Sequence, residues 1–272
     1  MKFKIGFTSD SYGKPQEDDS QPTVPAAVIP RKSVVQVMFP GRGSSLAYYN
    51  DRFDLKAGDL VYVDGKLEGR RGRVTEVNYN FKIKRSDYKQ VIALIDTTVK
   101  GQFHFAGSHF VTFDRHAIPF QKVVQWFKAP STEEDVFISG SDDTSFMLND
   151  LKGMKVSSAI AERGHDYYME NKVVYISIDG THGHAIVEGS EAYEVEFEYR
   201  NGEISHLTCS CFCSGSCKHE FAAMLQLRET LDAIQADFAE QYRQSGYFAA
   251  MSKSTLLCFA VTDKDSGSLT LG

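Results

Sequence analysis

Residues 193–224 read YEVEFEYRNGEISHLTCSCFCSGSCKHEFAAM, and the first half of this stretch predicts a β-hairpin. Large apolar residues alternate with glutamates over 193–199, a pattern typical of a strand with one buried face and one acidic face. Asn201-Gly202 follows at once and is the dipeptide most typical of a two-residue turn. Residues 204–211 are therefore expected to run back antiparallel and to carry cysteines to the far end of the hairpin.

The second half of the stretch opens a long amphipathic segment, HEFAAMLQLRETLDAIQADFAEQYRQSG, over residues 219–246. Its apolar residues recur three and four positions apart, which predicts one helix with a core-facing stripe. Gly246 is placed where a helix would stop. A cofactor or partner groove is the alternative role for this stripe, whose members are Met224, Leu227, Leu231, Ile234 and Phe238.

Four of the five cysteines fall within nine residues, and a histidine follows two positions after the last of them. Cys209 and Cys211 lie two apart on a strand end, so their side chains project to the same side. Cys217 and His219 lie in the turn and at the helix start, where the positive helix end favours thiolate. Three thiolates and one imidazole form a standard structural zinc set. The sequence therefore predicts one zinc ion bound by Cys209, Cys211, Cys217 and His219.

Other roles for the cysteines stay open. Cys213 is expected to be a free neighbour, although it is an alternative ligand in place of Cys211. A disulfide pair would need an oxidising compartment, and a redox-sensor cluster is a further possibility. Cys258 lies within the apolar segment STLLCFAV and is expected to be a small buried hydrophobe.

The order Cys209-Ser-Cys211, spacer, Cys217-Lys-His219 and apolar helix resembles the SWIM zinc finger. The resemblance covers about residues 155–231, a segment similar to the SWIM region of bacterial Snf-type helicases. Further positions that match are Arg163-Gly164, Tyr167-Tyr168 and Lys172-Val173. It implies a ββα zinc unit at 209–231 and an interaction with nucleic acid or protein. Cys213 and the five-residue spacer depart from the family's pattern.

The length of 272 residues suggests two domains, and the succession of strand and helix patterns predicts an α+β protein; the net charge is −6. Residues 31–130 hold 17 Lys and Arg against 9 Asp and Glu, whereas residues 131–272 hold 10 against 23. The charge contrast and the run of short apolar segments predict four regions: an extended arm at 1–32, a basic all-β domain resembling a small barrel at 33–128, an acidic linker at 129–145 and an α+β domain with the zinc unit at 146–272.

Within the second domain, two further elements are predicted. Residues 157–163 are expected to form a short helix stopped by Gly164. The tail is expected to form a hairpin from STLLCFAV and SLTL.

Common catalytic signatures are absent from the sequence. There is no GxxxxGK[ST] phosphate loop, no HExxH, no GxSxG and no GxGxxG that opens a helix after a strand, so the chain is not expected to be an enzyme or a helicase motor. His182 and His184 are expected in a solvated turn rather than in a second metal site. No transmembrane or signal segment is recognised, which predicts a cytoplasmic protein without a membrane partner.

A basic cluster in the first domain is the candidate nucleic-acid contact. Its charges interleave with Tyr79 and Phe81, which are able to stack on unpaired bases, and it comprises Lys66, Arg70, Arg71, Arg73, Lys82, Lys84 and Arg85. A solvated basic face is the alternative. The sequence thus favours a non-enzymatic nucleic-acid-binding accessory protein, with DNA favoured over RNA. The competing hypothesis is an adaptor that recruits a helicase or another nucleic-acid enzyme.

Overall fold

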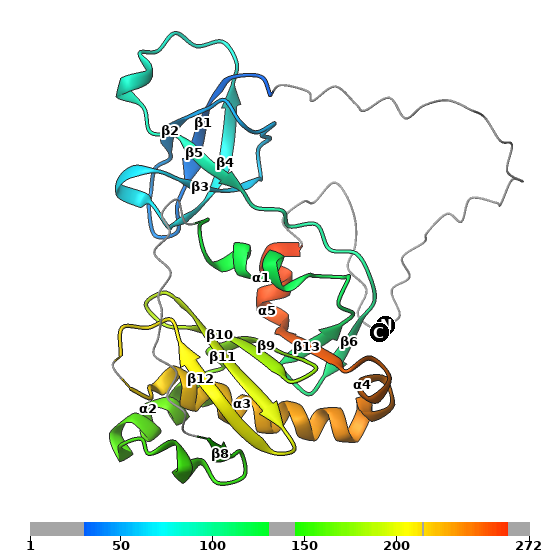
Figure 1. Cartoon of the computed structure of the whole chain (residues 1–272). Helices are drawn as coiled ribbons and strands as arrows, with labels where there is room; N and C mark the ends of the chain where they lie inside the picture. Colours follow the sequence, from blue (N-terminus) through cyan, green and yellow to red (C-terminus); the bar gives the residue numbers. More distant parts are fainter. Residues whose placement is uncertain (1–29, 131–144, 214, 261–272) are drawn as a thin grey trace, which may run out of the picture. The chain divides into compact units, whose positions relative to one another are not determined.

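The computed structural model describes residues 30–130, 145–213 and 215–260. The chain forms two compact units, which divide after Asp96, and each contains one antiparallel sheet (Figure 1). The predicted arm lies almost entirely outside the described residues, as do most of the predicted linker and the last strand of the predicted tail hairpin. The α+β class is confirmed.

The first unit is a five-stranded sheet in the order β2-β1-β4-β3-β5. Alternate residues of β1 point inward, so that Val35 and Val37 are fully buried with Val61, Val63 and Val74. The elements are β1 (Ser33–Met38), β2 (Leu46–Asn50), β3 (Leu60–Val63), η1 (Gly65–Leu67), β4 (Arg71–Asn78), η2 (Arg85–Asp87) and β5 (Val91–Leu94).

This sheet is open, which corrects the predicted barrel-like shape. Between its outer strands β2 and β5 there is one isolated bridge, which joins Tyr49 of β2 to Gln90, the residue before β5. There the Tyr49 amide donates a hydrogen bond to the Lys89 carbonyl at 2.8 Å. A closed barrel needs a continuous ladder between the first and last strands. β5 has only four residues, and its register against β3 shifts between Tyr62 and Val63.

The second unit is built on an eight-stranded antiparallel sheet in the order β6-β7-β13-β9-β10-β11-β12-β8. The central strands form a meander, and the outer ones come from distant parts of the chain. They are β6 (Phe103–Ala106), β7 (Phe110–Phe113), β8 (Phe146–Met147), β9 (Val173–Asp179), β10 (His182–Glu188), β11 (Ala192–Arg200), β12 (Glu203–Cys209) and β13 (Tyr247–Ser252).

Helices cover both faces of this sheet (Figure 1). On one face α3 packs over the core with α2 beside it, and Met224 and Leu227 are fully buried there. On the other face Trp126 of α1 stacks on Phe259 of α5, with ring centroids 4.6 Å apart. The helical elements are α1 (Phe120–Phe127), η3 (Leu151–Met154), α2 (Ser158–Met169), α3 (Lys218–Ala233), the π-helical η4 (Ile234–Phe238), α4 (Ala239–Ser245) and α5 (Lys253–Ala260).

The division after Asp96 lies earlier in the chain than the predicted linker at 129–145. Residues 97–130 contribute β6, β7 and α1 to the second unit, and β7 pairs with β13 through Val111 and Met251. The charge contrast that suggested a boundary near residue 130 therefore spans two units. Residues 31–96 hold 13 Lys and Arg against 8 Asp and Glu, a balance of +5.

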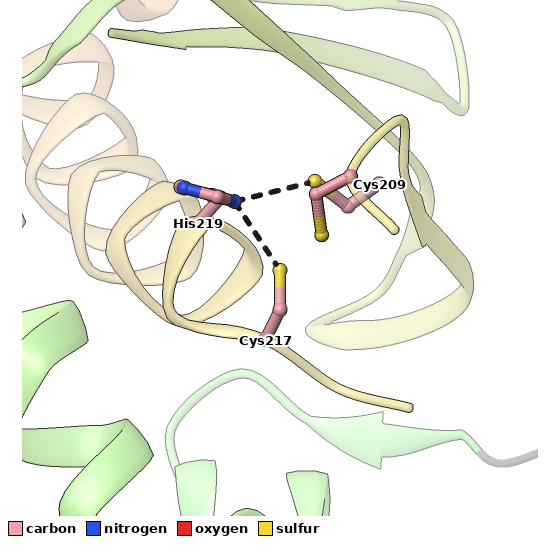
Figure 2. Close-up of side chains that lie close together, drawn as sticks. Cys209, Cys217 and His219 are labelled. Atoms are coloured by element: carbon pink, nitrogen blue, oxygen red, sulfur yellow. Dashed lines mark hydrogen bonds between the residues drawn. The ribbon is translucent and has the colours of Figure 1, made fainter. Parts of the chain in front are cut away.

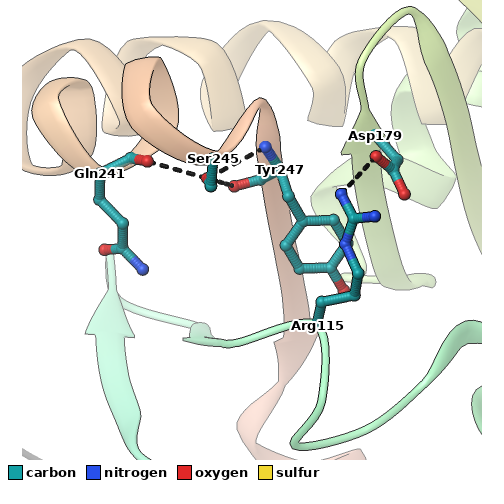
Figure 3. Close-up of polar contacts among 5 residues, drawn as sticks. All are labelled: Arg115, Asp179, Gln241, Ser245 and Tyr247. Atoms are coloured by element: carbon teal, nitrogen blue, oxygen red, sulfur yellow. Dashed lines mark hydrogen bonds and ion pairs between the residues drawn. The ribbon is translucent and has the colours of Figure 1, made fainter.

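Side-chain contacts link residues 97–130 to the rest of the second sheet (Figure 3). Arg115, which follows β7, pairs with Asp179 at 2.6 Å, and its guanidinium lies 4.9 Å from the centroid of the Tyr247 ring. Ser245 Oγ accepts a hydrogen bond from the Tyr247 amide at 3.1 Å and donates to the Gln241 carbonyl at 2.8 Å. These contacts hold the ends of β7, β9 and β13 together.

Three local predictions concern Gly246, Gly164 and the segment STLLCFAV. Gly246 ends the long helical segment in a left-handed conformation, as predicted, although the segment includes the π-helical turn η4. Gly164 does not stop a helix, because α2 continues to Met169. The missing side chain at Gly164 instead lets Phe221 and the Lys218 carbonyl approach α2 closely. Residues 254–260, the described part of STLLCFAV, lie in helix α5 rather than in a strand, since Leu256 and Phe259, three residues apart, are buried on one helix face.

Candidate metal centre

The hairpin β11–β12 brings Cys209 to the site. Asn201 and Gly202 both have positive φ, 52° and 87°, as a tight two-residue hairpin turn requires. Val195 and Phe197 of β11 are buried and Glu196 is exposed, so the predicted two-sided strand is confirmed. Cys209 is the last residue of β12 and pairs with Val195, which places its thiol on the buried side.

The start of helix α3 brings two more of the four predicted ligands, Cys217 and His219. Cys217 is its N-cap: the Cys217 sulfur accepts the Glu220 amide at 3.5 Å, and the Glu220 carboxylate accepts the Cys217 amide at 2.9 Å. This reciprocal arrangement is a capping box with cysteine in the place of serine. It fixes the direction of the helix start, so His219 faces the end of β12.

Three thiols and one imidazole meet at this junction (Figure 2). The ligand atoms lie within 4.8 Å of one another, and they belong to the four residues predicted from the sequence: Cys209, Cys211, Cys217 and His219. These residues are only 2–9% exposed. Cys213 is exposed and lies outside the group.

The spacing fits a tetrahedral metal ion. Nδ1 of His219 lies 3.7 Å from the sulfur of Cys209 and 3.7 Å from that of Cys217. Zinc bonds of about 2.3 Å to sulfur and 2.1 Å to nitrogen put the two donors about 3.6 Å apart in a tetrahedron. The set of three soft thiols and one imidazole also selects zinc over magnesium or calcium. The cluster is therefore able to hold one metal ion, with zinc the best match.

The thiols differ in acidity. The pKa of Cys217 is lowered to about 4, mainly by a hydrogen bond from the Cys209 thiol. Hydrogen bonds from His219 and from the Glu220 amide lower this pKa further. The same bond to Cys217, followed by burial, raises the pKa of Cys209, and burial raises the pKa of Cys211 to about 12. Metal binding would displace protons from the Cys209 and Cys211 thiols, because zinc binds thiolates.

Aromatic side chains surround the imidazole. The Tyr193 ring stacks on the His219 ring at 4.0 Å between centroids, and the Tyr167 ring lies edge-on at 5.5 Å. Burial raises the pKa of the nearby Glu220 carboxyl to about 8. The sequence analysis did not assign these three residues to the metal centre, although Tyr167 is among the positions of the SWIM resemblance. Glu220 carried a local signal as well, because an acidic residue three positions after an N-cap is typical of a capping box.

The residues of the predicted basic cluster lie before, on and after strand β4. Lys66 and Arg70 are exposed near the start of β4, whereas Lys82, Lys84 and Arg85 are exposed beyond its end. Arg71 and Arg73, on β4 itself, are half-buried, and Arg73 donates to the Gly58 carbonyl at 3.0 Å.

Two other sequence predictions are corrected. His182 and His184 lie on strand β10, not in a turn. The His184 ring lies 4.2 Å from that of Phe120, and burial lowers the pKa of His184. Cys258 is exposed rather than buried, because the apolar face of α5 passes through Leu256 and Phe259.

No protein-family model, curated protein or solved structure matches the chain. The SWIM resemblance therefore rests on the sequence pattern alone. Within the described residues, none of the helices has the length and apolar character needed to cross a membrane.

Proposed function

We propose that the protein is a zinc-binding, non-enzymatic accessory protein that binds nucleic acid, with DNA favoured over RNA, and that its zinc unit is of the SWIM type. The observation that carries the metal part is the buried cluster of three thiols and one imidazole within 4.8 Å. Four protein donors fill a tetrahedral shell and leave no position for a substrate. A closed centre supports a structural role, joining the end of β12 to the start of α3.

The loop that follows β4 supports the nucleic-acid part. Tyr79 is 37% exposed, and the Arg31 guanidinium lies 4.5 Å from its ring centroid. Lys82, Lys84 and Arg85 follow within six residues, all exposed. Exposed aromatic rings beside cations are the elements that sequence-tolerant binding to single strands requires, because bases stack on the rings and phosphates pair with the cations. The positive balance of residues 31–96 adds a favourable long-range field.

The experiment is a salt titration of the full chain with a short single-stranded oligonucleotide, followed by fluorescence anisotropy. Four or five phosphate contacts would weaken binding roughly a hundredfold between about 50 and 200 mM salt. Replacing Lys82 and Lys84 with Ala should reduce the slope of log affinity against log salt by about 1.5, since each contact contributes about 0.7 to 0.9.

The matched control removes the same number of charges from the other end of β4. Lys66→Ala with Arg70→Ala should leave the slope close to that of the wild type, because no aromatic pair accompanies these residues. Arg71 and Arg73 are unsuitable for this control, because both are half-buried and Arg73 donates a hydrogen bond to the Gly58 carbonyl. Equal losses in both double variants would indicate a general field effect rather than a site after β4.

The competing function is an adaptor that recruits a helicase or another nucleic-acid enzyme. Glu196 of β11 favours it, since its side chain is 58% exposed. If the chain binds no oligonucleotide at about 50 mM salt, the adaptor function is favoured over nucleic-acid binding, because electrostatic binding is strongest at low salt.

A further inference from the structure

The two ring nitrogens of His219 have different surroundings. Nδ1 faces the sulfurs of Cys209 and Cys217. Nε2 points away from them, is buried, and has no hydrogen-bond partner among the described residues. A metal ion held through Nδ1 leaves the imidazole proton on Nε2, because a neutral imidazole carries one proton. That buried N–H then needs an acceptor.

The Tyr167 hydroxyl lies at this end of the ring. A methyl group built on Gly189, in the turn between β10 and β11, would be 3.3 Å from the Tyr167 oxygen and 3.6 Å from His219 Nε2. The hydroxyl and the nitrogen therefore flank one point, and the absence of a side chain at Gly189 leaves their approach open. The other hydroxyl near the ring, that of Tyr193, is hydrogen-bonded to Ser190 at 2.7 Å.

Tyr167 is held firmly in this position. Gly164 lies one turn earlier on the same face of α2, and a Cβ there would be 2.8 Å from Phe221 and 3.0 Å from the Lys218 carbonyl. The two helices thus approach closely at the start of α3. The Lys218 ammonium also lies 4.3 Å from the centroid of the Tyr167 ring. Packing and a cation–π contact therefore fix the ring beside the ligand residue.

We propose that Tyr167 is a positioning residue of the metal centre and that its hydroxyl accepts a hydrogen bond from Nε2–H of His219 when the metal is bound. This inference rests on the proposed zinc centre and names a side chain that raises its affinity for zinc. An acceptor on the second nitrogen fixes the tautomer and orientation of a metal-bound histidine and raises its basicity. It also gives a partner to the one imidazole nitrogen that the cluster leaves unsatisfied.

The test compares two single-hydroxyl deletions in the full chain. Tyr167→Phe keeps the ring, its packing and the Lys218 contact, and should weaken zinc binding about 10- to 100-fold in competition with a chromophoric chelator. Tyr168→Phe is the matched control on the same helix, because it removes a real hydrogen bond to Glu229, of 3.1 Å, that is not directed at the metal. It should bind zinc with an affinity indistinguishable from that of the wild type.

A second readout separates positioning from general destabilisation. In the zinc-loaded wild type, long-range ¹H–¹⁵N spectra should show His219 metal-bound at Nδ1 and protonated at Nε2, with slow exchange of that proton that becomes faster in Tyr167→Phe. Unchanged affinity in Tyr167→Phe, equal losses in both variants, or a metal bound at Nε2 would each overturn the proposal. A wild type that binds no zinc would instead defeat the metal centre, and the inference with it.

Discussion

Removal of zinc is expected to unfold the second unit and to leave the first unit folded. Three of the proposed ligands, Cys209, Cys211 and Cys217, belong to the same core cluster as Ile204 and Met224. Without a metal ion, this cluster would bury three thiols and an imidazole with no ion to join them. Binding at such a site contributes on the order of 10 kcal/mol of folding free energy, comparable with the whole stability of a domain.

The measurement uses the only tryptophan of the chain, Trp126, which is fully buried in the second unit. Titration with a strong chelator should shift its fluorescence to that of an exposed indole. Hydrogen exchange in β1 and β4 should keep its protection. Retention of native Trp126 fluorescence after complete removal of the metal would contradict the expectation.

Single cysteine variants test the ligand set. Cys217→Ser should abolish stoichiometric zinc and expose Trp126, because it removes a thiolate ligand while the serine hydroxyl can still cap α3. Cys213→Ser is the matched control from the same loop and should retain one zinc per chain, since Cys213 is exposed. If zinc is lost in Cys213→Ser but retained in Cys211→Ser, the third thiolate ligand is Cys213 rather than Cys211.

Trp126→Ala is expected to destabilise the second unit by about 3–5 kcal/mol. The indole is fully buried and stacks on Phe259 at 4.6 Å, so truncation leaves a large cavity between α1 and α5. Leu257→Ala is the control on α5, because Leu257 is 47% exposed and its truncation should cost much less. Urea unfolding followed by hydrogen exchange separates the two units.

The same experiment tests which unit contains residues 97–130. Peptides from β9 and β13 should lose protection in Trp126→Ala at lower urea than in the wild type, whereas peptides from β1 and β4 should not change. Loss of protection in β1 and β4 alone would assign α1 to the first unit, as the charge contrast near residue 130 suggested.

The sequence by itself determined the features that depend on neighbours in the chain. Asn201-Gly202 predicts the β11–β12 hairpin because that turn needs residues tolerant of positive φ. Alternating glutamates predict the exposed face of β11, and the spacing of Met224 and Leu227 predicts the buried face of α3. The four candidate ligands were also predictable, because they lie within eleven residues of one another and the hairpin and helix that carry them have local signals.

Tertiary structure decided the features that depend on distant residues. Phe110–Phe113 reads as a strand in isolation, but only its pairing with Tyr247–Ser252 shows which sheet it joins. STLLCFAV is a short apolar run whose periodicity fits a strand or a helix, and packing of Phe259 on Trp126 favours the helix. Strand pairing and core packing join residues more than a hundred positions apart. Local composition and periodicity therefore cannot predict these contacts.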